Sequence, residues 1–172
     1  MIEVQAEKKA VWELAWKRWM LQSARCWEDM SGIIQPIGID IVDEEHMLFT
    51  KYALDLNLII RALNDREASF EDLHKGDEIF QRLLDYAEIH FDHDLEIMKE
   101  INTPLLKAHL EQHDIFMKMI NGYYDEFKRG RLHIVGGLKL SILDWWVNHI
   151  NGIDYQTFVV RNNKAANGGE ND

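Results

Sequence analysis

Histidine and aspartate side chains recur at metal-ligand spacing in the middle of this chain. His90 and Asp94 lie four residues apart, and His109 and His113 lie four residues apart. Residues four apart in an α-helix share one face, one turn above the other. A Thr-Pro pair, a strong helix-start signal, separates the two sets. The spacing therefore predicts two neighbouring helices that each direct two metal-type ligands from one face.

The flanking segments supply three further groups of the same kind. His46 precedes this stretch, and His149 and Asp154 follow it. Five residues apart in an α-helix, His149 and Asp154 differ by about 140° around the axis. Both reach inward only if two metal ions lie side by side and the carboxylate bridges them or approaches from the flank.

A single histidine on an apolar helix face is usually a core residue with satisfied hydrogen bonds. Burying five histidines and two acids without a metal would cost several kcal/mol in desolvation. The joint pattern therefore predicts a metal site. Its predicted ligands are His46, His90, Asp94, His109, His113, His149 and Asp154. His74, His93 and His133 are expected outside it, although His93 is only three residues from His90.

The donor set limits the choice of metal. Imidazole and carboxylate without thiolate suit iron, manganese, copper or zinc. Seven ligands are too many for one tetrahedral zinc and suit two octahedral ions bridged by the carboxylates. A redox-active pair in a helical protein is most naturally a pair of irons.

Apolar residues recur with the helical period in the segments that must position these ligands. Long helices are predicted over about 40–63, from an N-cap at Ser69 to just before Asn102, and from Thr103-Pro104 to about Arg129. A last helix begins between 132 and 138 and ends near 160. Short links imply an all-α, antiparallel up-down four-helix bundle.

The N-terminal residues 3–24 predict an additional amphipathic helix, with Trp12, Trp16 and Trp19 on one stripe. This stripe is expected to pack against the domain or a second copy, or to couple the domain to a partner. Residues 26–39, with Gly32, Pro36 and Gly38, predict an ordered arm or loop. The expected organisation is an extension over 1–26, the bundle over 27–161 and a polar tail over 162–172.

Composition excludes several classes of partner. The 172 residues suit one domain, and the net charge of −11 disfavours nucleic acid and anionic membrane surfaces. No apolar run approaches the ~18 residues of a membrane span, and no secretory signal is evident. The single cysteine, Cys26, cannot form an internal disulfide. A cytoplasmic location is therefore expected.

The ligand order resembles the hemerythrin family, and its bacterial branch in particular. The resemblance lies in His46, His90-Phe91-x-x-Asp94, His109-x-x-x-His113 and Trp145-Trp146-x-x-His149-Ile150-x-x-x-Asp154, together with Trp27 and the Gly38-Ile39-Asp40 arm. It covers roughly residues 27–160.

The resemblance implies a four-helix bundle holding two non-haem irons, bridged by an oxo or hydroxo group and carboxylates, that bind dioxygen reversibly. It implies that His109, His113 and His149 serve one iron and that His46 and His90 serve the iron with an open position. Asp94 and Asp154 would bridge the irons.

Two residues depart from the family pattern. The family has glutamate where this chain has Asp94, which is one methylene shorter, so we expect a closer helix or a monodentate or lost bridge, and a more labile site. Trp146 stands where the family commonly has leucine. The predicted dioxygen pocket consists of Phe49, Trp145, Trp146 and Ile150, although core packing alone would explain these residues.

Three functions are weighed for such a site. The first is an oxygen or redox sensor, which suits a labile centre, an extra helix and an output domain reached through the N-terminal helix or the C-terminal tail. The second is a stand-alone dioxygen carrier or store. Self-association of the chain is compatible with both the sensor and the carrier. The third is a diiron oxidase or peroxidase. It is disfavoured because oxygen-activating bundle enzymes usually use Glu-x-x-His motifs, and the expectation is therefore a protein that is not an enzyme.

Overall fold

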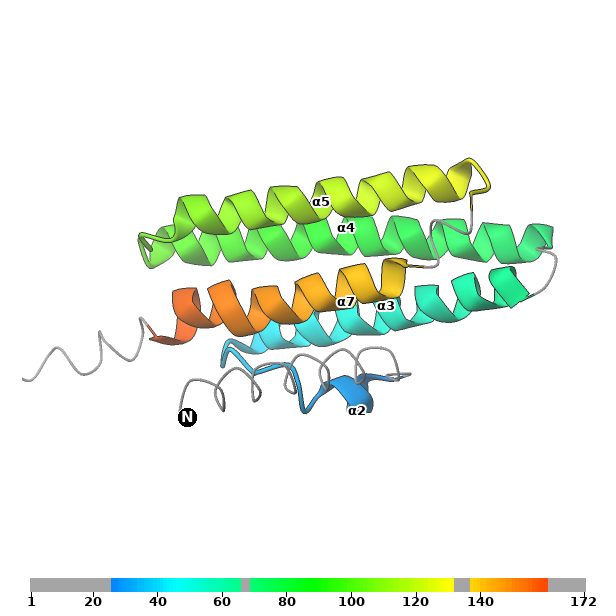
Figure 1. Ribbon diagram of the computed structural model, residues 1–172. Helices are drawn as coiled ribbons and strands as arrows, with labels where there is room; N and C mark the ends of the chain where they lie inside the picture. The colour runs from blue at the N-terminus through cyan, green and yellow to red at the C-terminus, as the bar shows by residue number, and fades with distance from the viewer. Residues whose placement is uncertain (1–25, 66–68, 132–136, 161–172) are drawn as a thin grey trace, which may run out of the picture.

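The computed structural model describes residues 26–65, 69–131 and 137–160, and long helices account for most of them (Figure 1). These helices are α3 (Asp40–Asp65), α4 (Phe70–Glu100), α5 (Leu106–Lys128) and α7 (Leu138–His149). The last continues without a break into the π-helix η1 (Ile150–Val160), and the short α2 (Trp27–Met30) precedes α3.

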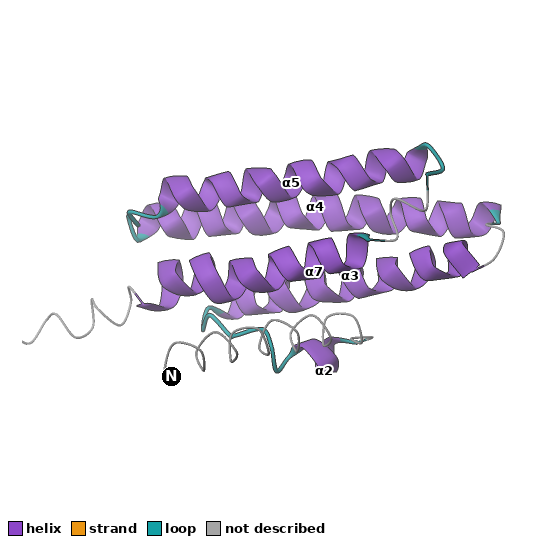
Figure 2. Cartoon of the chain, viewed as in Figure 1, coloured by secondary structure: helices purple, strands orange, loops and turns teal. Residues whose placement is uncertain are grey.

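Successive long helices run in opposite directions, as Figure 1 shows. α3 and α5 each pack against both α4 and α7, which places the four helices around one core. No strand occurs among the described residues (Figure 2). The predicted all-α, up-down four-helix bundle is confirmed. None of the described helices is long and apolar enough to cross a membrane.

Ser69 caps α4 as predicted. Its hydroxyl accepts a hydrogen bond from the Asp72 amide at 3.2 Å, and the Asp72 carboxylate accepts one from the Ser69 amide at 3.1 Å. This reciprocal capping box satisfies two backbone donors that the first helical turn leaves free.

The start of α5 differs from the prediction. Thr103 and Pro104 lie in a turn, the Thr103 hydroxyl accepts the Leu105 amide at 3.2 Å, and the helix begins at Leu106. The chain reverses direction here through Asn102, whose φ of 49° is left-handed. Thr103 and Pro104, which the sequence predicted as the N-cap and first residue of the helix, therefore belong to this reversal instead.

The arm or loop predicted over 26–39 begins with the short helix α2, and its remainder, residues 31–39, which we call the arm, connects α2 to α3 and lies along the bundle (Figure 1). The Asp43 carboxylate of α3 accepts the amides of Ile37 at 2.7 Å and Gly38 at 2.9 Å. Gly38 has a φ of +79°, a conformation that glycine adopts without strain. Asn151 of η1 holds the arm from the other side. The predicted ordered arm is therefore anchored to two helices.

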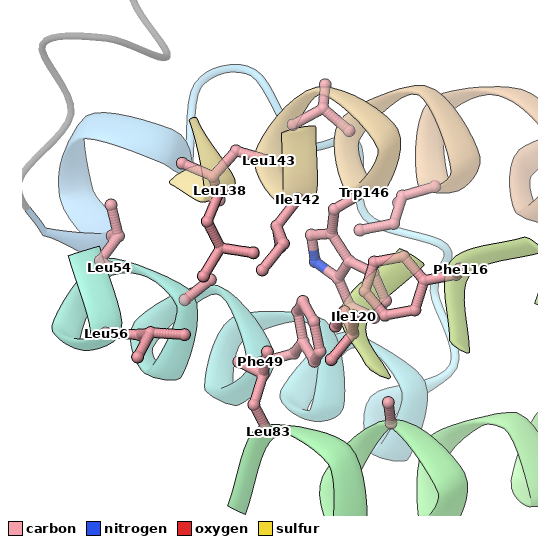
Figure 3. Packing of buried hydrophobic residues seen from close by; sticks show 14 of the residues in the cluster. Phe49, Leu54, Leu56, Leu83, Phe116, Ile120, Leu138, Ile142, Leu143 and Trp146 are labelled. Atoms are coloured by element: carbon pink, nitrogen blue, oxygen red, sulfur yellow. The ribbon is translucent and has the colours of Figure 1, made fainter. Parts of the chain in front are cut away.

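Aromatic and aliphatic side chains fill the core between the helices (Figure 3). Phe49 of α3 stacks on Trp146 of α7 with ring centroids 3.9 Å apart, and Phe116 of α5 packs edge-on against Phe49 at 5.5 Å. All three are fully buried. This aromatic layer joins three of the four long helices, and Trp146 also packs against two histidines described below.

The predicted helix over 3–24 with its tryptophan stripe lies outside the described residues, and so does the tail over 162–172. The proposed division into extension, bundle and tail therefore stays a prediction. His133 also lies outside the described residues.

Candidate metal centre

The structure brings all the predicted ligands together at one end of the bundle. His46 lies near the start of α3, and the His109 and His113 pair near the start of α5, while His90 and Asp94 lie near the end of α4. In an up-down bundle these ends coincide. Each of the seven predicted side chains is at most 5 % exposed.

Three imidazoles form one set, which we call the trio: His109, His113 and His149. The Nε2 atoms of His113 and His149 are 3.1 Å apart. One ligand atom from each trio residue and one Asp94 oxygen all lie within 4.8 Å of one another. That spacing could hold one metal ion.

Two further imidazoles form the pair: His46 and His90. Their ring centroids are 4.9 Å apart. The pair offers two nitrogens where the trio offers three, so a metal ion here would have fewer protein ligands and an open coordination position.

Asp154 presents a different oxygen to each set. Its Oδ1 lies 2.9 Å from Nε2 of His109 and 3.1 Å from Nε2 of His149, whereas its Oδ2 lies 3.4 Å from Nε2 of His46. A carboxylate placed in this way could bridge two metal ions.

The π-helix explains how Asp154 reaches this position. In a π-helix each N–H bonds the carbonyl five residues earlier, so residues five apart lie about one turn apart. Asp154 follows His149 by five residues in the segment where α7 becomes η1. The predicted divergence of about 140° between the two side chains is therefore wrong, because it assumed an α-helix.

Asp94 presents the same oxygen to both sets. Its Oδ2 lies 3.5 Å from Nε2 of His90, 3.7 Å from Nε2 of His109 and 3.6 Å from Nε2 of His113. The shorter acid thus reaches both the pair and the trio, but without giving each its own oxygen.

Unpaired polar atoms test whether these residues fit a metal. Both oxygens of Asp94 and Asp154, Nε2 of His90 and His109, and both ring nitrogens of His46 are buried without a hydrogen-bond partner. Buried polar atoms are normally hydrogen-bonded, and a lost partner costs about 1–3 kcal/mol each. Unsatisfied atoms of ligand type that converge on one place fit metal coordination.

Burial and neighbouring groups shift the two carboxylates in opposite directions. Burial, with the negative charges of Asp154 and Glu45, raises the pKa of Asp94 to about 8 even though His90 opposes it. Burial also acts to raise the pKa of Asp154, but the imidazoles of His149, His109 and His46 outweigh it and hold that pKa well below its usual range. Asp154 is therefore the ionised carboxylate at neutral pH.

Burial lowers the pKa of the His113 imidazole, with a further contribution from the neighbouring His149 and His109. Burial lowers the pKa of His149 as well. Both rings are therefore neutral at pH 7 and have a nitrogen lone pair for a metal ion.

Glu45 was not predicted as part of the site. Its carboxylate lies 3.0 Å from Nδ1 of His90 and accepts a second hydrogen bond from Nδ1 of the half-buried His93. Burial acts to raise the pKa of Glu45, but these two histidines lower it overall. With its Nδ1–H donated to Glu45, His90 keeps Nε2 free for a metal. His93 thus contacts the site indirectly.

Thr157 has a comparable role beside the trio. Its hydroxyl lies 3.3 Å from Nδ1 of His109, and the residue is fully buried. His74, in contrast, is largely exposed beside Glu78, as expected for a histidine outside the site.

The residues predicted to line a dioxygen pocket divide between the two sets. Trp146 packs edge-on against His46 at 5.5 Å and His90 at 5.3 Å, with Phe49 stacked behind it. Trp145 instead stacks on His149 at 4.3 Å, on the side of the trio. Ile150 is fully buried next to His149.

Comparison with known families agrees with this geometry. The family model described as "Hemerythrin HHE cation binding domain" matches residues 37–159, which include every predicted ligand. The chain belongs to the hemerythrin family. The hemerythrin domain thus spans the four long helices and η1, together with the end of the arm.

Several curated relatives of the hemerythrin domain are named bacteriohemerythrin. The one from Stenotrophomonas maltophilia (strain R551-3) is 29% identical over 120 residues, covering 69% of this chain and 71% of its own length. The one from Pseudomonas aeruginosa (strain LESB58) is 25% identical over 117 residues, with 68% and 71% covered. The one from Aquifex aeolicus (strain VF5) is 28% identical over 89 residues, with 51% and 68% covered. No solved structure matches the chain significantly.

Proposed function

We propose that this hemerythrin domain holds two non-haem iron ions and binds dioxygen, and that it acts as an oxygen or redox sensor. The observation that carries the proposal is the pair of buried carboxylates between two sets of imidazoles. Asp154 lies within 3.4 Å of ring nitrogens from both sets, and its oxygens have no hydrogen bond.

Each of the two imidazole sets would hold one of the two irons. The trio with Asp154 Oδ1 and Asp94 would hold one iron, and the pair with Asp154 Oδ2 and Asp94 would hold the other. When bound, the iron pair would supply the redox chemistry of reversible dioxygen binding. Because the pair has one imidazole fewer, an external ligand would occupy the position beside His46 and His90.

The surroundings of the pair favour binding over onward chemistry. Trp146 and Phe49 form an apolar wall beside the pair and are both fully buried. Such a wall excludes water and slows the escape of a charged, reduced ligand. The donor set is rich in histidine and lacks the Glu-x-x-His motifs of oxygen-activating bundle enzymes, so we propose a binding protein rather than an enzyme.

Sensing is favoured over carriage because of Asp94. Its Oδ2 faces both sets, while Asp154 gives one oxygen to each. A carboxylate sharing a single oxygen holds two metals less firmly, and the centre would therefore oxidise readily. A sensor needs an output, and we propose a cytoplasmic signalling partner reached through residues 1–26 or 162–172.

Anaerobic reconstitution with ferrous iron tests the proposal. We expect about two irons per chain and visible charge-transfer absorption after a dioxygen pulse. A content near zero or one, or a colourless oxygenated sample, would refute it. Autoxidation within seconds would support sensing, whereas lifetimes of minutes or longer would support a carrier. Asp94→Glu should slow autoxidation, because the longer acid can give each iron its own oxygen.

A further inference from the structure

A cavity of about 190 Å³ lies between the arm and the start of α3. Its lining residues are Ser31, Ile34, Pro36, Asp43 and His46. Ser31 and Pro36 are exposed to solvent, whereas His46 is 1 % exposed. The cavity therefore extends from the protein surface to one imidazole of the pair.

The imidazole at the end of this cavity differs from its neighbours. Both ring nitrogens of His46 are buried without a hydrogen-bond partner, whereas Nδ1 of His90 contacts Glu45 and Nδ1 of His109 contacts Thr157. His46 also belongs to the set with fewer imidazoles. The cavity thus reaches the imidazole of the pair whose Nε2 lies 3.4 Å from Oδ2 of Asp154.

The arm forms the outer wall of the cavity, and Asn151 of η1 fixes the part of the arm between Ile33 and Gln35. The Asn151 side-chain oxygen accepts the Gln35 amide at 2.8 Å, and its nitrogen donates to the Ile33 carbonyl at 2.7 Å. These two hydrogen bonds flank Ile34, the arm residue whose buried side chain lines the cavity. Asn151 is not among the predicted metal ligands, so the wall can open without moving them.

A second cavity of about 390 Å³ lies on the other side of the centre. Gln112, Trp145 and His149 are among its lining residues. It reaches His149 of the trio, whose metal position would have one more imidazole and therefore less room for an external ligand. This cavity supplies a matched control.

We propose that the cavity beside the arm is the route by which small ligands, dioxygen and small anions, reach the pair, and that the two hydrogen bonds from Asn151 to the arm act as a gate by limiting how often the route widens enough for a ligand to pass. The inference rests on the proposed diiron centre. A gate changes how fast a ligand enters and leaves, but it does not change the affinity, because the ligand-bound and ligand-free end states are the same.

Azide binding to the iron-loaded, oxidised protein tests this route by stopped-flow spectroscopy. Asn151→Ala should raise the association and dissociation rate constants together by roughly tenfold, as expected for two lost hydrogen bonds, with Kd unchanged. Ser31→Trp, which places a large ring at the mouth, should lower both constants. Gln112→Trp, at an exposed position of the second cavity, should leave them unchanged.

Amide hydrogen exchange at Gln35 gives an independent readout that needs no iron. Asn151→Ala should accelerate it without accelerating exchange in α4. Unchanged rate constants in Asn151→Ala, a change in only one of them that alters Kd, or slower azide binding in Gln112→Trp with no effect of Ser31→Trp, would overturn the inference and leave the diiron proposal standing. Failure of the parent protein to bind iron or azide would instead refute the proposed function.

Discussion

Nε2 of His149 lies 3.1 Å from Oδ1 of Asp154, although the two residues are five apart in one continuous helical segment. The π-helical backbone of η1 makes this contact possible. This backbone directs the Asp154 side chain toward the candidate metal centre, where its two oxygens face different imidazole sets. Asp94, on α4, has no equivalent arrangement, and the two carboxylates are therefore expected to contribute unequally.

Asparagine substitutions should reveal this inequality. Asp154→Asn removes the one carboxylate that gives the pair its own oxygen, so metal content should fall from about two ions toward one per chain. Asp94→Asn should lose less, because Asp154 still offers Oδ1 to the trio and Oδ2 to the pair. Metal analysis after desalting measures both. Equal losses in the two variants would show that Asp94 bridges as strongly as Asp154.

Removing Glu45 should weaken metal binding without touching a ligand. Glu45→Ala leaves Nδ1 of His90 without its acceptor, and such losses typically reduce metal affinity about 10- to 100-fold. His93→Asn should have a smaller effect, because the His90–Glu45 hydrogen bond remains. Competition with a chelator measures the affinities. A His93 variant as weak as the Glu45 variant would mean that His93 is needed to hold Glu45 in place.

Metal binding should release a proton from Asp94. Since the pKa of Asp94 is raised to about 8, the metal-free centre holds this proton at pH 6.5 and has lost it at pH 9.5. The lowered pKa values of His113 and His149 leave those rings neutral, with no proton to release. Calorimetry in buffers of different ionisation enthalpy should detect about one proton at the lower pH only. Equal release at both values would contradict the shift.

The shifted pKa values of Asp94, His113 and His149 also determine how the free energy of unfolding of the metal-free protein depends on pH. Asp94 favours folding most when protonated, so its contribution to the free energy of unfolding falls as pH rises from about 4 to about 8. His113 and His149 act oppositely: their contribution is present above about pH 6.5 and is lost as pH falls. Bound metal should flatten the alkaline limb, because it stabilises ionised Asp94.

Two helical glycines should respond oppositely to alanine. A Cβ at Gly76 would lie 2.5 Å from Cζ of Phe127, so Gly76→Ala should destabilise the bundle by about 1–3 kcal/mol despite the better helix propensity. Gly122 is exposed, with nothing within 4 Å of the added Cβ. Gly122→Ala should stabilise the bundle by about 1 kcal/mol. Urea denaturation measures both, and a stabilising Gly76→Ala would show that the Phe127 ring moves aside freely.

The sequence was sufficient to predict what depends on local periodicity. Apolar spacing gave the long helices, and the Ser69–Asp72 capping box fixed the start of α4. His90, His109 and His113 were found because i, i+4 spacing places ligands on one face, and His46 and His149 because each lies on one of the other two predicted helices. The two-residue error at α5 arose because the chain reversal at Asn102 used the Thr-Pro start signal for a turn.

Interactions between distant residues were beyond prediction from one sequence. Glu45 and His90 are 45 residues apart. An acidic residue in the first turns of a helix is normally expected to have a solvent-exposed side chain, so Glu45 gave no sign of this contact. The π geometry of η1 has no local sequence signal, although the five-residue spacing of His149 and Asp154 was a clue. Placing Trp145 against His149, away from the pair, required knowing how α7 is rotated about its axis.

The continuous π segment makes the end of this bundle sensitive to chain length. Three residues of η1 contact distant parts of the chain: Asn151 contacts the arm, and Asp154 and Thr157 contact His109. Deleting Ile150 would shift all three together relative to α7. Engineers who transplant this centre to another scaffold therefore need to copy the segment whole, with its residue count unchanged.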